Sequence, residues 1–500
     1  MLLLVGASIQ ALRMVSNLID PVELDYGEGI ILFQATEVLS LKTAFHPLEQ
    51  YPHVVFHYTP LYHLAVRAVM SVVHNILLSG RLVSMAATVW IVGVLMWVVL
   101  RAARRYAPDR VRWYAALFTG AWVLLLPPIE WSPWARVDML GLAFQFTGLS
   151  ILTVKPFRLR NQIIAFVLLL LGLFTKQSLV AIPAASILLM GLIRPVRALL
   201  LAAGLAAAGA AIVLVLAWQT QGSILRHWIL YNVNPFRVKQ ALTLLAQYSS
   251  NLMVLIAIAL AATWLTFPRT NNKAAWRARW RAASARLAAS PLRRTGLAFG
   301  LVAVCGFVVS WGIGKDGANM NYCLDWQLAL CPLAGIFMVL FLGRWTARDR
   351  GMEMLRPVLF LALGSTALVV GVQTLIDCNN AGGWTGSARE KRLIERREQA
   401  ELVQLISTFP GPVVSENMTL LLRAGRTVPF EPAIIKQTTD TGIFDERPLV
   451  KRTADKFFDA FILYTGTGRF SPGMWDAIHR NYRSYVFGSG AYTVYVRSVT

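Results

Sequence analysis

The chain has 500 residues, of which 56% are hydrophobic and 15% are charged. Soluble domains carry about 25% charged residues, and here the apolar residues form long blocks, so the composition excludes an ordinary soluble protein and predicts a polytopic membrane protein. The formal net charge is +22, but the basic residues cluster in loops between the apolar blocks, which argues against a nucleic-acid-binding protein. The four cysteines form no CxxC motif, so no zinc framework is expected.

Eleven apolar blocks of about 15–22 residues are each long enough, some barely, to cross about 30 Å of hydrocarbon. They are expected at residues 1–19, 82–100, 113–127, 137–153, 161–174, 178–193, 198–218, 248–267, 295–311, 326–343 and 357–376. The first is expected to be a retained span rather than a signal peptide, because it has no basic start and no small-residue cleavage site. The predicted fold class is therefore an α-helical multi-pass membrane protein with about 11 transmembrane helices.

The charge of the loops predicts their orientation. One set of alternate loops, at 101–112, 155–160, 194–197, 268–294 and 344–356, holds 22 Lys and Arg in 62 residues, whereas the other set holds 8 in about 114. The basic set is expected on the cytoplasmic side, together with the N-terminus. The second set, at 20–78, 128–136, 175–177, 219–247 and 312–325, is expected outside, as is everything after residue 376.

The sequence changes character after residue 376. The remainder is charged and mixed, with helical patterns at 388–408, 416–424, 449–460 and 473–482 and strand-like runs at 412–415, 426–429, 461–464, 484–487 and 491–497. Alternating strands and helices predict a small α/β domain. We therefore expect a transmembrane module over 1–376, with interfacial helices in its first outer loop at 20–78, and an extracytoplasmic α/β domain over 377–500.

Acidic residues directly follow the first apolar block, in the run Glu23-Leu24-Asp25-Tyr26-Gly27-Glu28. Carboxylates beside a bilayer are costly and usually serve a pathway or a reaction. A carboxylate here can act as a general base on a hydroxyl or bind a cation, while the alternative is that the acids cap short surface helices. His53 and His57 of the same loop would share one face of a helix, which makes them weak candidates for a metal site that nothing else completes.

Three other outer loops each place one cation near the membrane surface. They contain Arg136 with Asp138, Lys176 with Gln177, and Lys315 with Asn319, Asn321 and Tyr322. Lys and Arg are natural partners of phosphate. Each cation alone fits interfacial snorkelling, but three together, opposite a group of acids, predict a site for a phosphate-bearing lipid. Tyr58 and Tyr62, which lead from the acidic loop into an amphipathic stretch, are further substrate-binding candidates.

The acids after the first span, the Pro-Leu-Tyr at 60–62, the basic inner loops and the motifs at 136–138, 175–177 and 317–322 resemble the GT-C superfamily of membrane glycosyltransferases. Within it, the chain is similar to the protein mannosyltransferase and aminoarabinose transferase type, over spans one to about ten. The resemblance implies an inverting transfer of a sugar from a polyprenyl-phosphate carrier to an acceptor hydroxyl on the outer face. It implies that Asp25 is the general base and that Glu28, separated from it by Tyr-Gly, is a helper.

The resemblance also implies that Arg136, Lys176 and Lys315 contact the donor phosphate. No cofactor is required, although a divalent cation stays an open alternative. The implied partners are a polyprenyl-phosphate-linked sugar donor, a glycan, lipid or protein acceptor, and membrane lipids, with no nucleic acid. The expected location is a bacterial plasma (inner) membrane.

Two other classes of protein stay open. A flippase or transporter of lipid-linked sugars would place polar groups deep inside its spans and break helices at mid-membrane depth, whereas only Arg13 lies near the centre of a predicted span. A membrane-anchored glycan-binding protein would act through its tail, where Ser415-Glu416-Asn417 follow a predicted strand, a common ligand position in α/β folds. Cys323 and Cys378 are both expected outside and are candidates for a disulfide.

Overall fold

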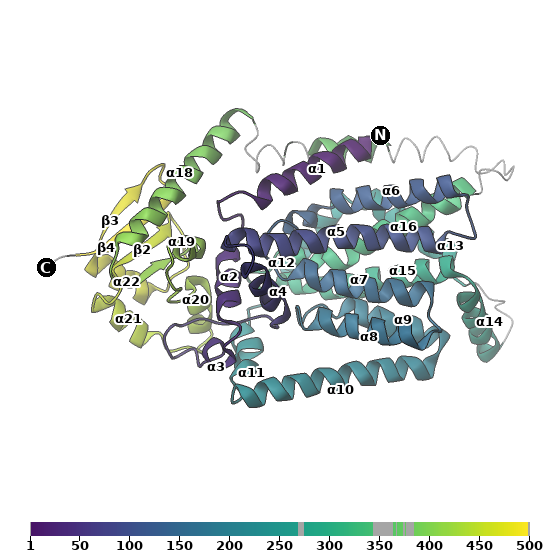
Figure 1. Cartoon of the computed structure of the whole chain (residues 1–500), viewed down its shortest axis with the longest axis horizontal. Helices are drawn as coiled ribbons and strands as arrows, with labels where there is room; N and C mark the ends of the chain where they lie inside the picture. Colours follow the sequence, from purple (N-terminus) through teal and green to yellow (C-terminus); the bar gives the residue numbers. More distant parts are fainter. Residues whose placement is uncertain are drawn as a thin grey trace.

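The computed structural model describes residues 2–268, 275–343, 364–366, 368–373, 376 and 385–498. Its main body is a bundle of helices that run side by side along the long axis of the molecule (Figure 1). The bundle contains α5 (Ile76–Ala102), α6 (Asp109–Leu125), α7 (Asp138–Val154), α8 (Leu159–Leu173), α9 (Ala181–Ile193), α10 (Pro195–Gln219), α13 (Met253–Thr266), α15 (Pro291–Ser310) and α16 (Leu324–Gly343). Helix α1 (Leu2–Leu18) lies against α6 at the edge of the bundle.

Ten of the eleven predicted apolar blocks coincide with helices, and the block at 357–376 lies mostly outside the described residues. In the described part of the chain, four helices at Ile76–Ala102, Pro195–Gln219, Pro291–Gly314 and Met320–Leu342 are long and apolar enough to cross a membrane. A fifth candidate is the pair α12 (Val238–Ser250) and α13, which is bent by 83°. These helices define a multi-pass membrane protein. The count of eleven spans stays a prediction.

The bent pair changes one detail of the predicted topology. The sequence predicts a span at 248–267 and an outer loop at 219–247, but helix α12 occupies the second half of that loop. The break falls at Asn251 and Leu252, between the amphipathic α12 of 13 residues and the apolar α13 of 14 residues. The predicted span starts at 248, close to this break, because α12 carries polar side chains on one face whereas α13 is apolar.

The loops of the bundle gather at two ends. Helix α14 (Trp276–Ala289) lies at one end, whereas α2 (Glu28–Glu37), α3 (Leu41–Ala44), α4 (Leu61–Met70) and α11 (Ser223–Trp228) lie at the other (Figure 1). Contacts between distant loops agree with this division. Near α14, the Tyr106 hydroxyl lies 2.6 Å from Ser290 Oγ, and Arg294 donates to Thr153 O at 2.8 Å.

We call the end near α14 the basic end and the opposite end the site end. The described loops predicted to be cytoplasmic all belong to the basic end, and those predicted to be outside belong to the site end. The structure thus groups the loops as the charge pattern does. The side of the membrane that each end faces stays a prediction.

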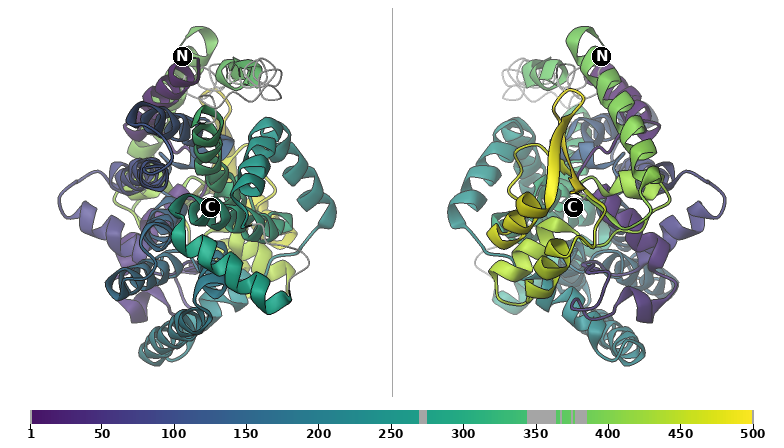
Figure 2. Two further views of the ribbon diagram at one scale, coloured as in Figure 1. Left: turned by 90° about the vertical axis from the view of Figure 1, so that its right-hand side faces the viewer. Right: turned by 90° about the vertical axis from the view of Figure 1, so that its left-hand side faces the viewer.

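Residues 385–498 cover the site end, and we call them the C-terminal unit (Figure 2, right). Its sheet has the order β1-β2-β4-β3, with β1 (Val413–Ser415) parallel to β2 (Ala460–Tyr464) and with β4 (Tyr492–Arg497) antiparallel to both β2 and β3 (Tyr482–Phe487). The helices are α18 (Gly386–Thr408), α19 (Met418–Arg423), α20 (Pro432–Asp440), α21 (Arg447–Ala454) and α22 (Pro472–Asn481). Its extracytoplasmic placement stays a prediction.

One local prediction in the C-terminal unit was wrong, and one helix was not predicted. The run 426–429 is not a strand, because Pro429 has no N–H for a ladder, and only an isolated bridge from Phe430 to His53 forms beside it. Helix α20 was not predicted, although Pro432 occupies its first position, which is a favoured place for proline.

The C-terminal unit shares a hydrophobic core with the first loop of the site end. Leu48 and Val55 of that loop are buried in one cluster with Phe430, Phe458 and Phe461. Burial of such apolar surface is the main favourable term in association. The loop is therefore held in place by residues almost 400 positions further along the chain.

An ion-pair cluster adds a second attachment. Asp20, which is 4% exposed, accepts hydrogen bonds from Arg392 at 3.0 Å and from Arg396 at 2.9 Å, both in α18. Burial acts to raise the pKa of Asp20, but the two guanidinium groups outweigh it and hold the pKa below its usual value. Asp20 is therefore charged and fixes α18 beside the end of α1.

The contact between α2 and α19 is close enough to be tested. A Cβ added at Gly29 would lie 2.7 Å from both Met418 Cβ and Thr419 N. We expect Gly29→Ala to push α19 away, at a cost of about 1–3 kcal/mol, and so to lower the unfolding temperature in detergent and speed tryptic release of the C-terminal unit.

Gly93→Ala is the matched control, because no atom lies within 4 Å of a Cβ at Gly93 in α5. That variant should keep or slightly raise the unfolding temperature, since alanine favours helix. Equal behaviour of the two variants would contradict the described docking.

Candidate active site

Glu28 opens α2 and is completely buried against Arg81 of α5, which is also 0% exposed. Arg81 Nε donates to Oε1 at 2.8 Å and its Nη2 donates to Oε2 at 2.7 Å, which is a two-pronged contact. The backbone N–H groups of Ala135 and Leu24 donate to the same two oxygens at 2.9 and 2.8 Å. Because each carboxylate oxygen already accepts two hydrogen bonds from the protein, these contacts favour a structural role for Glu28.

Asp25 forms an ion pair with Arg136, and both side chains keep some exposure, at 15% and 17%. Its Oδ2 also accepts from the Gly27 N–H at 3.1 Å. The Arg136 guanidinium lies so close over Gly27 that a Cβ there would collide with it. Asp25 is therefore more accessible than the buried Glu23 and Glu28 of the same run.

Asp138, the first residue of α7, gathers polar groups from three other segments. Lys176 Nζ lies 2.5 Å and Asn321 Nδ2 lies 3.1 Å from its Oδ1, and Trp131 Nε1 donates to its Oδ2 at 2.9 Å. A carboxylate is favoured at a helix N-terminus. Burial acts to lower the pKa of Lys176, but Asp138 outweighs it and raises that pKa, so the lysine is charged.

The two aspartate–cation pairs belong to one site. Trp131 touches both, because its indole N–H binds Asp138 while its ring centroid lies 5.5 Å from the Arg136 guanidinium carbon. Lys176 Nζ lies 5.8 Å from the centre of the Tyr58 ring. Burial raises the pKa of Tyr58, and the charges of Lys176 and Arg136 oppose that rise. Of the three cations predicted to share a site, Arg136 and Lys176 thus lie in one cluster, and their contact with a donor phosphate stays a prediction.

Three further predicted residues lie around these pairs. The centre of the Tyr322 ring is 5.4 Å from Lys176 Nζ. Gln177 Nε2 donates to the backbone oxygen of His57 at 2.6 Å. Tyr62 is completely buried, and its hydroxyl donates to Gly80 O at 2.9 Å, so it joins α4 to α5.

Asn319 and Lys315 stand apart from the cation pairs. Asn319 Oδ1 accepts from the Met320 N–H at 2.7 Å and so caps the short helix η4 (Met320–Cys323). Lys315 is exposed, and its backbone forms an isolated bridge with Phe236. In the described residues, no contact joins Lys315 to Asp138 or Asp25.

His53 and His57 do not share a helix face, because residues 53–57 form no helix. His53 Nδ1 lies 2.7 Å from Leu48 O, inside the core shared with the C-terminal unit. Burial, helped by His227, lowers the pKa of His57 to about 3, so that ring is neutral. No group of three or more His, Cys, Asp or Glu suited to a metal ion is found among the described residues.

Cys323 is a buried free thiol. Its predicted partner, Cys378, lies outside the described residues.

The C-terminal unit contributes site residues that the sequence analysis did not select. The Arg469 guanidinium carbon lies 3.9 Å from the centre of the Tyr26 ring, and the Ala433 N–H donates to the Tyr26 hydroxyl at 3.4 Å. Glu431 is 6% exposed and has one carboxyl oxygen without a hydrogen-bond partner in the described part of the chain. Burial raises the pKa of Glu431 to about 7, although Arg136 and Arg469 act to lower it. Along the chain, Glu431 thus lies between Phe430, which pairs with His53, and Ala433, which contacts Tyr26.

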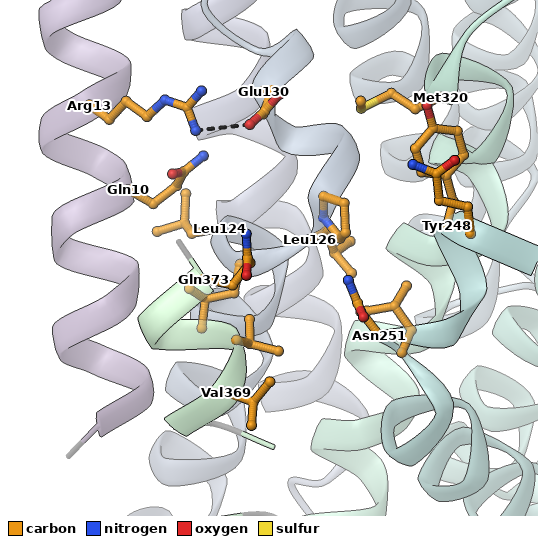
Figure 3. A pocket seen from close by; sticks show the side chains of 15 residues that line it. Gln10, Arg13, Leu124, Leu126, Glu130, Tyr248, Asn251, Met320, Val369 and Gln373 are labelled. Atoms are coloured by element: carbon orange, nitrogen blue, oxygen red, sulfur yellow. Dashed lines mark hydrogen bonds and ion pairs between the residues drawn. The ribbon is translucent and has the colours of Figure 1, made fainter. Parts of the chain in front are cut away.

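A cavity of about 400 Å³ opens beside the site, between α1, the end of α6 and the bent helix pair (Figure 3). Arg13 and Glu130 form an ion pair of 2.9 Å at its polar side. Leu124, Leu126 and Val369 give it an aliphatic wall. Its lining also includes Met320, in the same short helix as Asn321 and Tyr322. The cavity therefore combines polar groups with an aliphatic wall, and its lining residues Met320 and Glu130 directly precede Asn321 and Trp131, which bind Asp138.

The chain shares its overall fold with two solved structures of ArnT, which agrees with the resemblance at the level of the fold. ArnT from Cupriavidus metallidurans bound to undecaprenyl phosphate matches with a TM-score of 0.59 and 14% identity, over 99% of this chain and 98% of that chain. ArnT in the apo state matches with a TM-score of 0.57 and 16% identity, over 98% and 97%.

A third structure, the Archaeoglobus fulgidus oligosaccharyltransferase tethered with an acceptor peptide, gives 11% identity and a TM-score of 0.47 over 99% of this chain and 74% of that chain, which is too low to support an argument. The sequence matches no protein-family model and no curated protein.

The buried pair of Glu28 and Arg81 gives the first test of the site. Glu28→Gln leaves the Arg81 charge buried without its counter-charge, and breaking such a pair typically costs about 3–5 kcal/mol. We expect a clearly lower unfolding temperature in detergent. Asp316→Asn, which removes an ion pair with Arg237 whose side chains are 33% and 66% exposed, should change that temperature little. Equal shifts would show that Glu28 does not fix the scaffold.

Proposed function

We propose that the protein is a glycosyltransferase that moves a sugar from a polyprenyl-phosphate carrier to an acceptor hydroxyl at the site end. The observation that carries the proposal is the pairing of two aspartates with two cations in one site, next to a cavity with an aliphatic wall. The ArnT structure of the same fold is described as bound to undecaprenyl phosphate, which supports a polyprenyl carrier.

The donor phosphate is proposed to lie between Arg136 and Lys176. Each cation is held by its own aspartate, and Trp131 contacts both pairs, so both long side chains are already in place for a further anion. The polyprenyl chain would then follow the aliphatic wall of the cavity beside α1. Lys315 is exposed and apart from this pair, so we give it no contact with the donor.

The chemistry proposed is an inverting displacement. The acceptor oxygen bonds to the anomeric carbon of the sugar while the bond from that carbon to the phosphate oxygen breaks. Asp25 takes the hydroxyl proton, and the polyprenyl phosphate leaves with the bonding electrons. Arg136 and Lys176 stabilise the charge that grows on the leaving phosphate. Glu28 positions Asp25 through the short segment that joins them and does not touch substrate.

The bent pair α12–α13 keeps a transporter of lipid-linked sugars as a second candidate, since broken helices mark many transport sites. Asp25 and Lys176 nevertheless lie at one end of the bundle rather than at its middle. A transporter would carry the lipid-linked sugar between leaflets and form no new glycosidic bond. The assay below separates the two functions.

The base is tested with purified protein, a panel of polyprenyl-phosphate sugars and acceptors, and the release of polyprenyl phosphate as readout. Loss of a general base typically costs about 10²- to 10⁴-fold in rate, so Asp25→Asn should lower kcat by at least about 100-fold while donor binding changes much less. Asp316→Asn, an acid at the same end of the bundle, should keep full turnover. Near-normal turnover of Asp25→Asn would remove Asp25 as the base.

The phosphate contact is tested separately. Lys176→Gln removes the charge held by Asp138, and polyprenyl phosphate, the product, should then inhibit the enzyme at least about tenfold more weakly, because a charged hydrogen bond to phosphate is lost. Lys239→Gln removes an exposed lysine of α12 and serves as the control. Unchanged product inhibition in Lys176→Gln would exclude this lysine as a phosphate ligand.

A further inference from the structure

The basic end of the bundle holds a second cavity, of about 680 Å³, at the opposite end from the candidate active site (Figure 1). It lies where the ends of α5, α7, α8, α14 and α15 meet. We call it the basic cavity, because six exposed cations form its rim, namely Arg101, Arg104, Arg105, Lys155, Arg158 and Arg160, and a seventh, Arg294, is buried in its wall.

No acidic residue lines the basic cavity. None of the six cations forms an ion pair or a side-chain hydrogen bond within the described residues. Asp109, the acid nearest to them in that loop, is already paired with Arg112. Six like charges around one hollow repel one another and raise the local potential. A bound anion with several negative charges would relieve that repulsion.

Hydrogen bonds between helices hold the walls of the basic cavity in place. Arg294 is 3% exposed and donates to Thr153 O at 2.8 Å and to Leu287 O at 2.6 Å. These bonds join the ends of α7, α14 and α15. The side chains of Trp97, Ile151 and Ile164 add an apolar wall that continues along the bundle. The cavity thus combines a cationic rim with an apolar wall.

We propose that the basic cavity binds the headgroup of an anionic phospholipid from the leaflet at the basic end. The cations bind the phosphate, and the apolar wall takes the first carbons of the acyl chains. Six cations exceed what one phosphate needs, so a headgroup with two phosphates fits best. Basic pockets between membrane helices are suited to such headgroups. This proposal stands independently of the proposed transfer reaction.

The test uses the purified full chain in detergent, freed of lipid and titrated with cardiolipin, phosphatidylglycerol or phosphatidylcholine. Binding is measured by native mass spectrometry and by the rise in unfolding temperature. The triple variant Arg104→Gln/Arg158→Gln/Arg160→Gln should bind cardiolipin at least about tenfold more weakly. Arg158→Gln alone should weaken it about fivefold, which keeps the test valid if the triple variant does not fold.

The control is the triple variant Arg277→Gln/Arg279→Gln/Arg281→Gln, which removes the same charge from exposed positions of α14 at the same end. It should retain cardiolipin binding. Equal losses in the two triple variants would overturn the proposal in favour of general attraction to basic loops. Equal stabilisation by inorganic phosphate or pyrophosphate would overturn the lipid assignment. Equal binding of phosphatidylglycerol and cardiolipin would overturn the preference for two phosphates.

Discussion

The buried ion pair between Glu28 and Arg81 fixes the geometry on which the candidate site depends. Arg81 also donates to three backbone carbonyl oxygens between the end of α1 and the acidic run. Glu28 in turn accepts from the Ala135 N–H, next to Arg136. One contact thus sets the positions of both Asp25 and Arg136. A buried ion pair adds little net stability by itself, so its main contribution here is positional.

The two residues between the acids now have a physical explanation. Tyr26 extends to the C-terminal unit, where Arg469 lies over its ring, and Gly27 leaves the space that the Arg136 side chain occupies. Asp25 and Glu28 bind different partners, because Asp25 pairs with Arg136 and Glu28 pairs with Arg81. Two directly adjacent acids would not leave room for both the aromatic contact and the guanidinium.

Much of this arrangement follows from local patterns in the sequence. Apolar length located the helices, loop charge sorted the loops into the two ends, and isolated cations in polar loops identified Arg136 and Lys176. Arg81 was missed because a single arginine at the edge of an apolar block looks like interfacial snorkelling. Arg469 and the segment that contains Glu431 and Ala433 were missed because their contacts with Tyr26 span about 400 residues and leave no periodic signal in the sequence.

The core shared by the first loop and the C-terminal unit has a consequence for biosynthesis. Glu23 accepts a hydrogen bond from Tyr464, and Arg469 lies over the ring of Tyr26. The acidic run is translated early, but its contacts with these residues can form only after the end of the chain has been translated. The helices that are inserted first into the membrane would contain both aspartate–cation pairs. The side of the site that the C-terminal unit covers would still be exposed. The site is closed only when translation has passed the second half of the C-terminal unit, which keeps a nascent chain from presenting a finished site.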